Sequence, residues 1–322
     1  LELLRLVTIV HVNSFILITG FYQSESRFRL SKIIDLMLLS LFYKAVIMIV
    51  FSHFDIINLS KVQIIKELFP LEIVHSWYFK YYIILYFLSP FINKGINALN
   101  KKSYNNLLII LIVFFSIIPM LTNGVGLENS GFTLYQFVFI YIIGAYIRKF
   151  FLKENKISKS KLMILLIFIF TMCIILNYGI YKYSFLYESN DTILGELLLN
   201  YRKYYLFYSN ILIVVQSISY FLFFGLFSFN SKIINHISKM MFGIYLLHDN
   251  NYVRMNIYNW LEINNDLIYS FRYFLYVIYI AFLIFVFSYL IESIRFYICS
   301  GIKKFKFIKK IREKLDKYNL CE

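Results

Sequence analysis

The feature that most restricts the fold is a series of long apolar segments separated by short polar gaps. A helix needs about 20 mostly apolar residues to cross the roughly 30 Å hydrocarbon core of a bilayer. Candidate segments lie at 3–22, 35–52, 76–93, 107–122, 132–148, 162–181, 204–228, 233–249 and 272–294. The segment 233–249 is the weakest, because it contains His236 and Lys239. The sequence therefore predicts an all-α, polytopic transmembrane helical bundle with about nine spans.

Composition supports a membrane protein and argues against a nucleic-acid-binding protein. The 322 residues are 60% hydrophobic and only 16% charged, whereas about a quarter of a soluble domain is charged. The formal net charge is +15, but the basic residues lie in short gaps between apolar segments instead of on a soluble face. We therefore expect membrane lipids as partners and no nucleic acid.

Lysine and arginine alternate between the gaps in the way expected for a multi-pass protein. One set of alternate gaps, together with the C-terminal segment from Arg295, holds 23 of these residues, and the other set holds 7. Because short cytoplasmic loops are enriched in Lys and Arg, the richer set is predicted to be cytoplasmic. The gap at 148–161 belongs to this set.

The chain divides into a predicted transmembrane domain, residues 1–300, and a basic cytoplasmic tail, residues 301–322. Apolar residues of the tail recur near helical spacing, with lysines between them. This pattern is typical of a helix on an anionic inner leaflet, although a solvated basic tail accounts for it equally well. Upstream, Pro90 is expected to end the helix that begins near position 76.

Motifs of soluble enzymes are absent, and the three cysteines have no metal-ligand spacing. Chemistry is therefore expected from polar residues within or beside the spans, and no metal is expected. His11, Ser14 and Thr19 share part of a helix face. A neutral His11 there is able to act as a general base on a hydroxyl. The alternative is that Ser14 and Thr19 bond back to their own helix and His11 lies at the interface.

Two further groups of polar residues are candidates for ligand binding. Arg27, Arg29 and Lys32 lie before a span and suit the phosphates of a nucleotide-bearing donor, or simple positive-inside anchoring. His248, Asp249 and Asn250 follow an apolar segment that ends outside. A carboxylate beside an imidazole fixes its tautomer and an amide bonds sugar hydroxyls, but an ordinary polar helix end explains this group equally well.

Six stretches in order resemble a bacterial membrane acyltransferase family, acyltransferase 3, and especially members that O-acetylate cell-surface polysaccharides. They are "LELLRLVTI" (1–9), "VNSFILITGFY" (12–22), "WYFKYYIILYFLSPFINKGI" (77–96), "FVFIYIIGAYIRKF" (137–150), "YSNILIVVQSISYFLFF" (208–224) and "FGIYLLHDN" (242–250). The resemblance implies about ten helices in the bacterial cytoplasmic (inner) membrane. It also implies acetyl-CoA as acyl donor, and a hydroxyl of a polysaccharide or glycolipid as acceptor.

In one respect the chain departs from the family's pattern. The resemblance implies a catalytic histidine about eleven residues after an arginine matched by Arg5, but Ile16 stands there and His11 follows Arg5 by only six residues. We interpret this as an N-terminal deletion of about one helix and a loop. The expected function is O-acyl transfer with His11 and Arg5 as catalytic candidates. The alternatives are an inactive remnant, or a polysaccharide flippase or polymerase.

Overall fold

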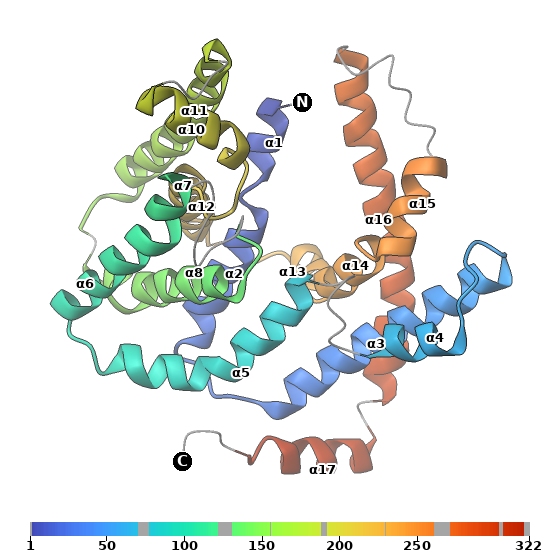
Figure 1. The fold of residues 1–322 in the computed structure, drawn as a ribbon. Coiled ribbons are helices and arrows are strands. Elements are labelled where there is room, and N and C mark those ends of the chain that lie inside the picture. Colours follow the sequence, from blue (N-terminus) through green and yellow to red (C-terminus); the bar gives the residue numbers. More distant parts are fainter. Residues whose placement is uncertain are drawn as a thin grey trace. The chain divides into compact units, whose positions relative to one another are not determined.

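The computed structural model describes residues 2–69, 77–121, 131–154, 156–187, 192–228, 230–260, 271–302 and 305–318. This part of the chain is almost entirely helical and contains no strand. Six stretches of it are long and apolar enough to cross a membrane: Glu2–Gln23, Leu30–His53, Lys101–Leu121, Leu134–Glu154, Lys159–Leu186 and Arg272–Ile302. They coincide with six of the expected spans, so the all-α polytopic fold is confirmed (Figure 1).

The chain forms two compact units, and the first contains residues 1–27 and 81–228. Its helices are α1 Glu2–Thr8, α2 His11–Gln23, α5 Trp77–Asn97 (from Tyr81 onward), α6 Lys101–Ile112, α7 Ile118–Leu121, α8 Leu134–Tyr146, α9 Leu152–Glu154, α10 Lys159–Tyr183, α11 Ile193–Tyr204 and α12 Ile211–Gly225. Single π-helical turns, Val113–Ile117 and Ile147–Phe151, continue α6 and α8, and a 3₁₀ turn, Ser184–Leu186, follows α10. Helix α2 packs between α8 and α12, and α12 packs on α10.

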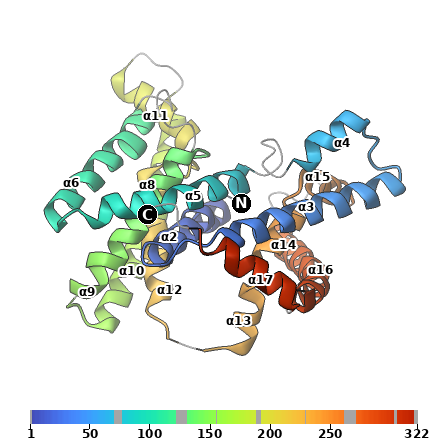
Figure 2. The same cartoon turned by 90° about the horizontal axis from the view of Figure 1, so that it is seen from below.

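The second unit contains residues 28–80 and 229–320. Its helices are α3 Leu30–His53, α4 Lys61–Leu68, α13 Lys232–Ser238, α14 Met241–His248, α15 Asn251–Trp260, α16 Phe271–Ile302 and α17 Lys306–Leu315. Helix α14 packs against both α3 and α16. Helix α17 turns away from the end of α16 and lies beside the first part of α3, as both ribbon views show (Figure 2).

Two glycines allow α2 and α8 to touch through their backbones. A Cβ atom on Gly20 would lie 2.2 Å from the carbonyl oxygen of Tyr141, and one on Gly144 would lie 2.4 Å from the carbonyl oxygen of Leu17. Without a strong hydrophobic driving force in lipid, close contact between small residues is a main source of helix association. This crossing fixes α2, and with it the position of His11.

Three expectations about helix boundaries are wrong. The expected span 204–228 is reduced to α12, Ile211–Gly225, because residues 205–210 form turns between α11 and α12. Helix α5 continues through Pro90 to Asn97. Proline has no N–H for the carbonyl of Tyr86, four residues earlier, but the Ser89 hydroxyl donates to that carbonyl at 2.7 Å. The substitute bond removes part of the penalty of a proline inside a helix.

The expected span 233–249 is two short helices instead of one. Helix α13 ends at Ser238, Lys239 and Met240 form a turn, and α14 then begins at Met241. The amide of Met240 donates to the carbonyl of Ile237 in this turn, which breaks the helical repeat. Neither helix has the roughly 17 residues that a straight crossing needs.

Candidate active site

His11 is the first residue of α2 and follows a break in the N-terminal apolar segment. Helix α1 ends at Thr8, Ile9 and Val10 form a turn, and α2 starts at His11. The imidazole is exposed on unit 1, and its Nδ1 lies 2.9 Å from the carbonyl oxygen of Thr8. A carbonyl oxygen only accepts hydrogen bonds, so Nδ1 carries the proton of the neutral ring. The lone pair is therefore on Nε2, which is the tautomer that a general base needs.

Tyr208 faces this lone pair. Its hydroxyl lies 3.5 Å from Nε2 of His11, and the two rings meet edge to face with centroids 5.9 Å apart. Because Nε2 is the acceptor in this tautomer, the tyrosine hydroxyl is the donor. The pair joins residues 197 positions apart, so a base and a hydroxyl from opposite ends of unit 1 meet at the break between α1 and α2.

The backbone of Tyr208 is held by two buried amides. The side chains of Asn13 and Gln136 each donate to the carbonyl of Tyr208 at 2.9 Å, and both residues are fully buried. Gly131 has a φ of 82°, and a Cβ atom there would lie 2.6 Å from Cβ of Tyr208. The backbone of Tyr208 is therefore held by hydrogen bonds from α2 and α8 and by close packing against the turn before α8. These contacts position its hydroxyl toward His11.

The same region contains acceptors that are not used. Ser14 Oγ and Gln136 Oε1 are buried without a hydrogen-bond partner. A buried polar group without a protein partner costs about 1–3 kcal/mol unless water or a ligand bonds to it. Thr19, by contrast, bonds back to the Phe15 carbonyl of its own helix at 2.9 Å. On the polar face proposed from the sequence, Thr19 thus bonds to its own helix, whereas the Ser14 hydroxyl has no protein partner.

Arg5 lies on α1, and its guanidinium pairs with Glu2 at 3.4 Å. The other carboxylate oxygen of Glu2 accepts the Tyr205 hydroxyl at 2.5 Å. The side chain of Arg5 is 63% exposed. The role of Arg5 in catalysis stays a prediction. In this structure its guanidinium forms an ion pair with Glu2, the first residue of α1.

The predicted donor-phosphate residues lie around the start of α3. Arg27 is exposed in the segment before the helix and belongs to unit 1, whereas Arg29 and Lys32 belong to unit 2. Arg29 is the N-cap residue of α3, and Lys32 lies in the first turn. A helix N-terminus attracts anions, but Asp316 already occupies the amide of Ser31 at 2.9 Å. Arg29 is exposed beside this occupied terminus.

His248, Asp249 and Asn250 lie together where α14 gives way to α15, but Asp249 does not orient the imidazole. Nδ1 of His248 lies 2.7 Å from the carbonyl oxygen of Ile244, so this carbonyl fixes the tautomer. Asp249 pairs with Arg254 at 3.3 Å. Asn250 accepts the amide of Tyr252 at 3.0 Å and so starts α15. The expected carboxylate–imidazole contact is replaced by local helix-end bonds.

Sequence reasoning missed an ionic cluster inside unit 2. Glu292 of α16 is 1% exposed and accepts hydrogen bonds from the Tyr43 hydroxyl and from Arg295 at 2.5 and 2.6 Å. A Cβ atom on Gly243 would lie 2.2 Å from its carboxyl carbon. The signal was available, because a glutamate three residues before an arginine in an otherwise apolar helix is costly unless paired.

Comparison with known proteins identifies the family. A family model described as an acyltransferase domain matches residues 3–306, which covers nearly all of unit 1 and most of unit 2, including His11 and the ionic cluster but not α17 beyond its first residue. The searches of curated proteins and of solved structures gave no match. Together with the apolar helices, the match shows that the chain belongs to the acyltransferase 3 family of multi-pass membrane acyltransferases.

Proposed function

We propose that this protein transfers an acetyl group from acetyl-CoA to a hydroxyl of a cell-surface polysaccharide or glycolipid, in the bacterial cytoplasmic membrane. The family supports acyl transfer in general. The observation that carries the proposal is the placement of the His11 ring, with Nδ1 2.9 Å from the Thr8 carbonyl oxygen and Nε2 3.5 Å from the Tyr208 hydroxyl.

The chemistry follows from this geometry. Nε2 of His11 accepts the proton of the acceptor hydroxyl as its oxygen attacks the thioester carbonyl carbon. The new C–O bond forms, the C–S bond breaks, and the proton passes from the imidazolium to the departing thiolate of coenzyme A. The bond from Nδ1–H to the Thr8 carbonyl keeps the orientation of the ring while the proton moves on and off Nε2.

The Tyr208 hydroxyl marks the place of the acceptor hydroxyl in this proposal. As the donor that faces Nε2 at 3.5 Å, it occupies the position that the acceptor hydroxyl takes during reaction. On binding, the sugar hydroxyl replaces the tyrosine hydroxyl as the partner of Nε2. Ser14 Oγ and Gln136 Oε1 are the spare buried acceptors in the same region.

The remaining roles rest on charge and hydrogen-bonding chemistry. Arg27, Arg29 and Lys32 supply cations for the phosphates of acetyl-CoA. His248, Asp249 and Asn250 supply polar atoms for the acceptor sugar.

A reconstituted assay tests the proposal. Vesicles containing the purified protein are supplied with acetyl-labelled acetyl-CoA and the glycan of the host, and ester formation on the glycan is measured. His11→Ala should lower turnover by about 10²–10⁴-fold, the usual contribution of a general base. His53→Ala is the matched control, because His53 is an exposed histidine at the end of α3. Equal rates for His11→Ala and the wild type would exclude His11 as the base.

A catalytically inactive remnant is the second candidate, and one observation favours it. Ile16 stands where the resemblance implies a histidine, and it is a fully buried apolar side chain of α2 that has no proton to transfer. In that case the wild-type protein forms no ester, and His11→Ala has no activity to lose.

A further inference from the structure

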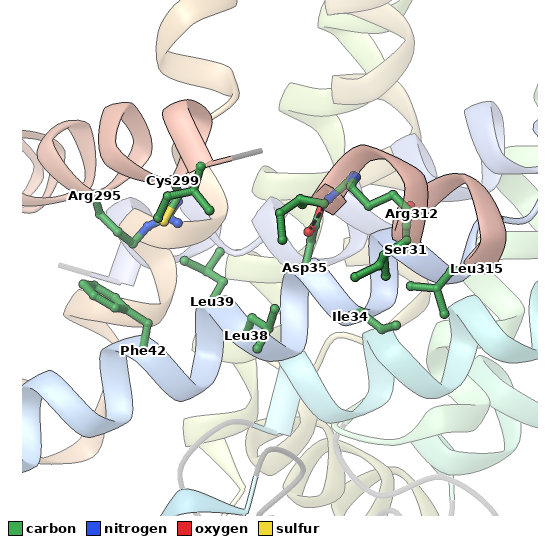
Figure 3. Close-up of a pocket in the computed structure, with 13 residues that line it drawn as sticks. Ser31, Ile34, Asp35, Leu38, Leu39, Phe42, Arg295, Cys299, Arg312 and Leu315 are labelled. Carbon is green, nitrogen blue, oxygen red and sulfur yellow. Dashed lines mark hydrogen bonds and ion pairs between the residues drawn. The ribbon is translucent and has the colours of Figure 1, made fainter. Parts of the chain in front are cut away.

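An apolar pocket of about 280 Å³ lies in unit 2, at the elbow where α16 ends and α17 turns along α3. Figure 3 shows residues of α3 along one side, Arg295 and Cys299 of α16 at one end, and Arg312 and Leu315 of α17 at the other. Its apolar lining includes Ile34, Leu38, Leu39, Phe42, Ile308 and Leu315. The volume is close to the lower end of the range of ~300–1,000 Å³ for small-molecule sites.

The charged side chains and the serine around the pocket are already bonded to protein partners, Ser31 through both its amide and its hydroxyl. The pairs are Arg312–Asp35 at 2.6 and 2.7 Å, Ser31–Asp316 at 2.9 Å twice, and Arg295–Glu292 at 2.5 and 2.6 Å. A ligand with amide groups, such as a pantetheine arm, would bury those groups against alkyl side chains, and a buried amide without a partner is costly. A plain alkyl chain has no such cost, so the lining favours a hydrocarbon ligand.

Helix α17 gives the pocket a cationic rim. Between residues 306 and 315 the chain has five basic residues and one acidic residue, a net charge of +4. Helical spacing places Ile308, Ile311 and Leu315 on the pocket side, with Lys309 and Lys314 flanking them. The charge distribution along the chain predicts that this segment is cytoplasmic, where the leaflet is anionic.

Two exposed aromatic rings favour a position of the elbow at the surface of the bilayer. Phe305 and Phe307 are 66% and 72% exposed, next to Lys306. Exposed aromatic side chains among lysines are typical of helices that lie in the plane of the interface. A lipid of the same leaflet therefore has its headgroup level with the lysines and its tails level with the pocket.

We propose that this pocket holds one acyl chain of an anionic phospholipid of the cytoplasmic leaflet, with the lysines of α17 around its headgroup. The lipid then acts as a structural ligand that fills the space between α3, α16 and α17. The proposal is independent of the acyl-transfer reaction, because it uses none of the residues placed in that chemistry.

Photo-crosslinking tests the site. The protein is reconstituted with trace phosphatidylglycerol carrying a diazirine at the end of one acyl chain, irradiated, and mapped by peptide mass spectrometry. We expect adducts on residues 34–42, 295–302 and 308–315. The adduct yield should exceed that from phosphatidylcholine with the same tail by at least about fivefold, because each lysine near the surface favours anionic lipid.

Cys299→Trp should abolish these adducts by filling the pocket. Ile298→Trp is the matched control, because Ile298 is the neighbouring residue on α16, is 61% exposed and is not part of the lining. If Cys299→Trp does not fold, Leu38→Trp fills the pocket from α3, where Leu38 is 58% exposed and tolerates a larger side chain.

Three results would overturn the proposal. The first is equal labelling by the anionic and the zwitterionic lipid. The second is labelling of the lining that persists in a folded filling variant. The third is displacement of the label by palmitoyl-CoA but not by unlabelled phosphatidylglycerol, which would assign the pocket to the acyl donor.

Discussion

The two units bury polar side chains of different kinds. Among the described residues of unit 1, every buried polar residue apart from tyrosine is an uncharged amide or serine, such as Asn13, Gln136 and Gln216. In unit 2 the buried set includes two charged residues, Lys44 and Glu292. Lys44 donates to the Phe69 carbonyl at 2.9 Å, and Glu292 is bonded to Tyr43 and Arg295.

The two kinds of buried group differ in how much stability is lost when a hydrogen-bond partner is missing. A neutral amide tolerates an unused acceptor at a cost of about 1–3 kcal/mol, whereas a buried charge must be fully paired. Unpartnered buried polar atoms occur in both units, on Ser14, Ser116, Gln136 and Gln216 of unit 1 and on Ser40 and Tyr245 of unit 2, whereas both carboxylate oxygens of Glu292 are bonded. We therefore expect substitutions near His11 to change turnover, and substitutions near Glu292 to change stability.

The largest effect on stability should come from Arg295→Met. It leaves the carboxylate of Glu292 buried with only Tyr43, and removing one partner of a buried ion pair costs about 3–5 kcal/mol. Thermal unfolding in detergent, followed by circular dichroism, measures the loss. The double variant Glu292→Gln/Arg295→Met should regain most of it, because no charge remains. A single variant as stable as the wild type would show that this cluster is not a support.

Gly20→Ala should have the next largest effect. The new methyl group meets the backbone carbonyl of Tyr141 at 2.2 Å, so α2 and α8 must separate, and overpacking of this kind costs about 1–3 kcal/mol. Gly179→Ala is the control, because nothing lies within 4 Å of the added atom in α10. That variant should be neutral or slightly stabilising, since alanine favours a helix. The same unfolding measurement applies, and equal melting temperatures for the two would contradict the backbone contact.

Gln136→Leu tests whether a buried amide beside Tyr208 affects acetyl transfer as well as stability. It removes one of two bonds to the Tyr208 carbonyl and should cost about 1 kcal/mol of stability. Gln216→Leu is a close match, because Gln216 is also fully buried, donates to a backbone carbonyl, that of Leu6 at 2.8 Å, and has an unused oxygen. Both variants should lose similar stability, but only Gln136→Leu should lower acetyl transfer at saturating substrate. Equal transfer rates would mean that Tyr208 does not need this support.

Long helices were predictable from the sequence because each one is set by a local apolar run. The spans 35–52 and 272–294 lie within α3 and α16. The break between α1 and α2 was not predictable, because Ile9 and Val10 include neither glycine nor proline. The continuation of α5 through Pro90 was not predictable either, because it involves a bond from the Ser89 hydroxyl to the Tyr86 carbonyl that composition does not show.

The site was only half predictable, for a related reason. His11 and Asn13 stand out as polar residues in an apolar segment, but Tyr208 is one of 29 tyrosines. Its importance arises from a contact across 197 positions, which no local periodicity encodes. Glu292 shows the opposite case, because its isolation in α16 was visible in the sequence and needed only the rule that intramembrane charges are paired.

The smallest effect is expected at the Asp249–Arg254 pair. This pair tests whether every ion pair of unit 2 contributes strongly to stability. The side chain of Arg254 is 51% exposed and the contact is 3.3 Å. An exposed pair contributes about 0.2–1 kcal/mol and weakens with salt. A double-mutant cycle of Asp249→Asn and Arg254→Gln should therefore give a coupling energy in that range, falling at high ionic strength. A coupling as large as that of Glu292 with Arg295 would show that exposure does not separate supporting pairs from surface pairs in this unit.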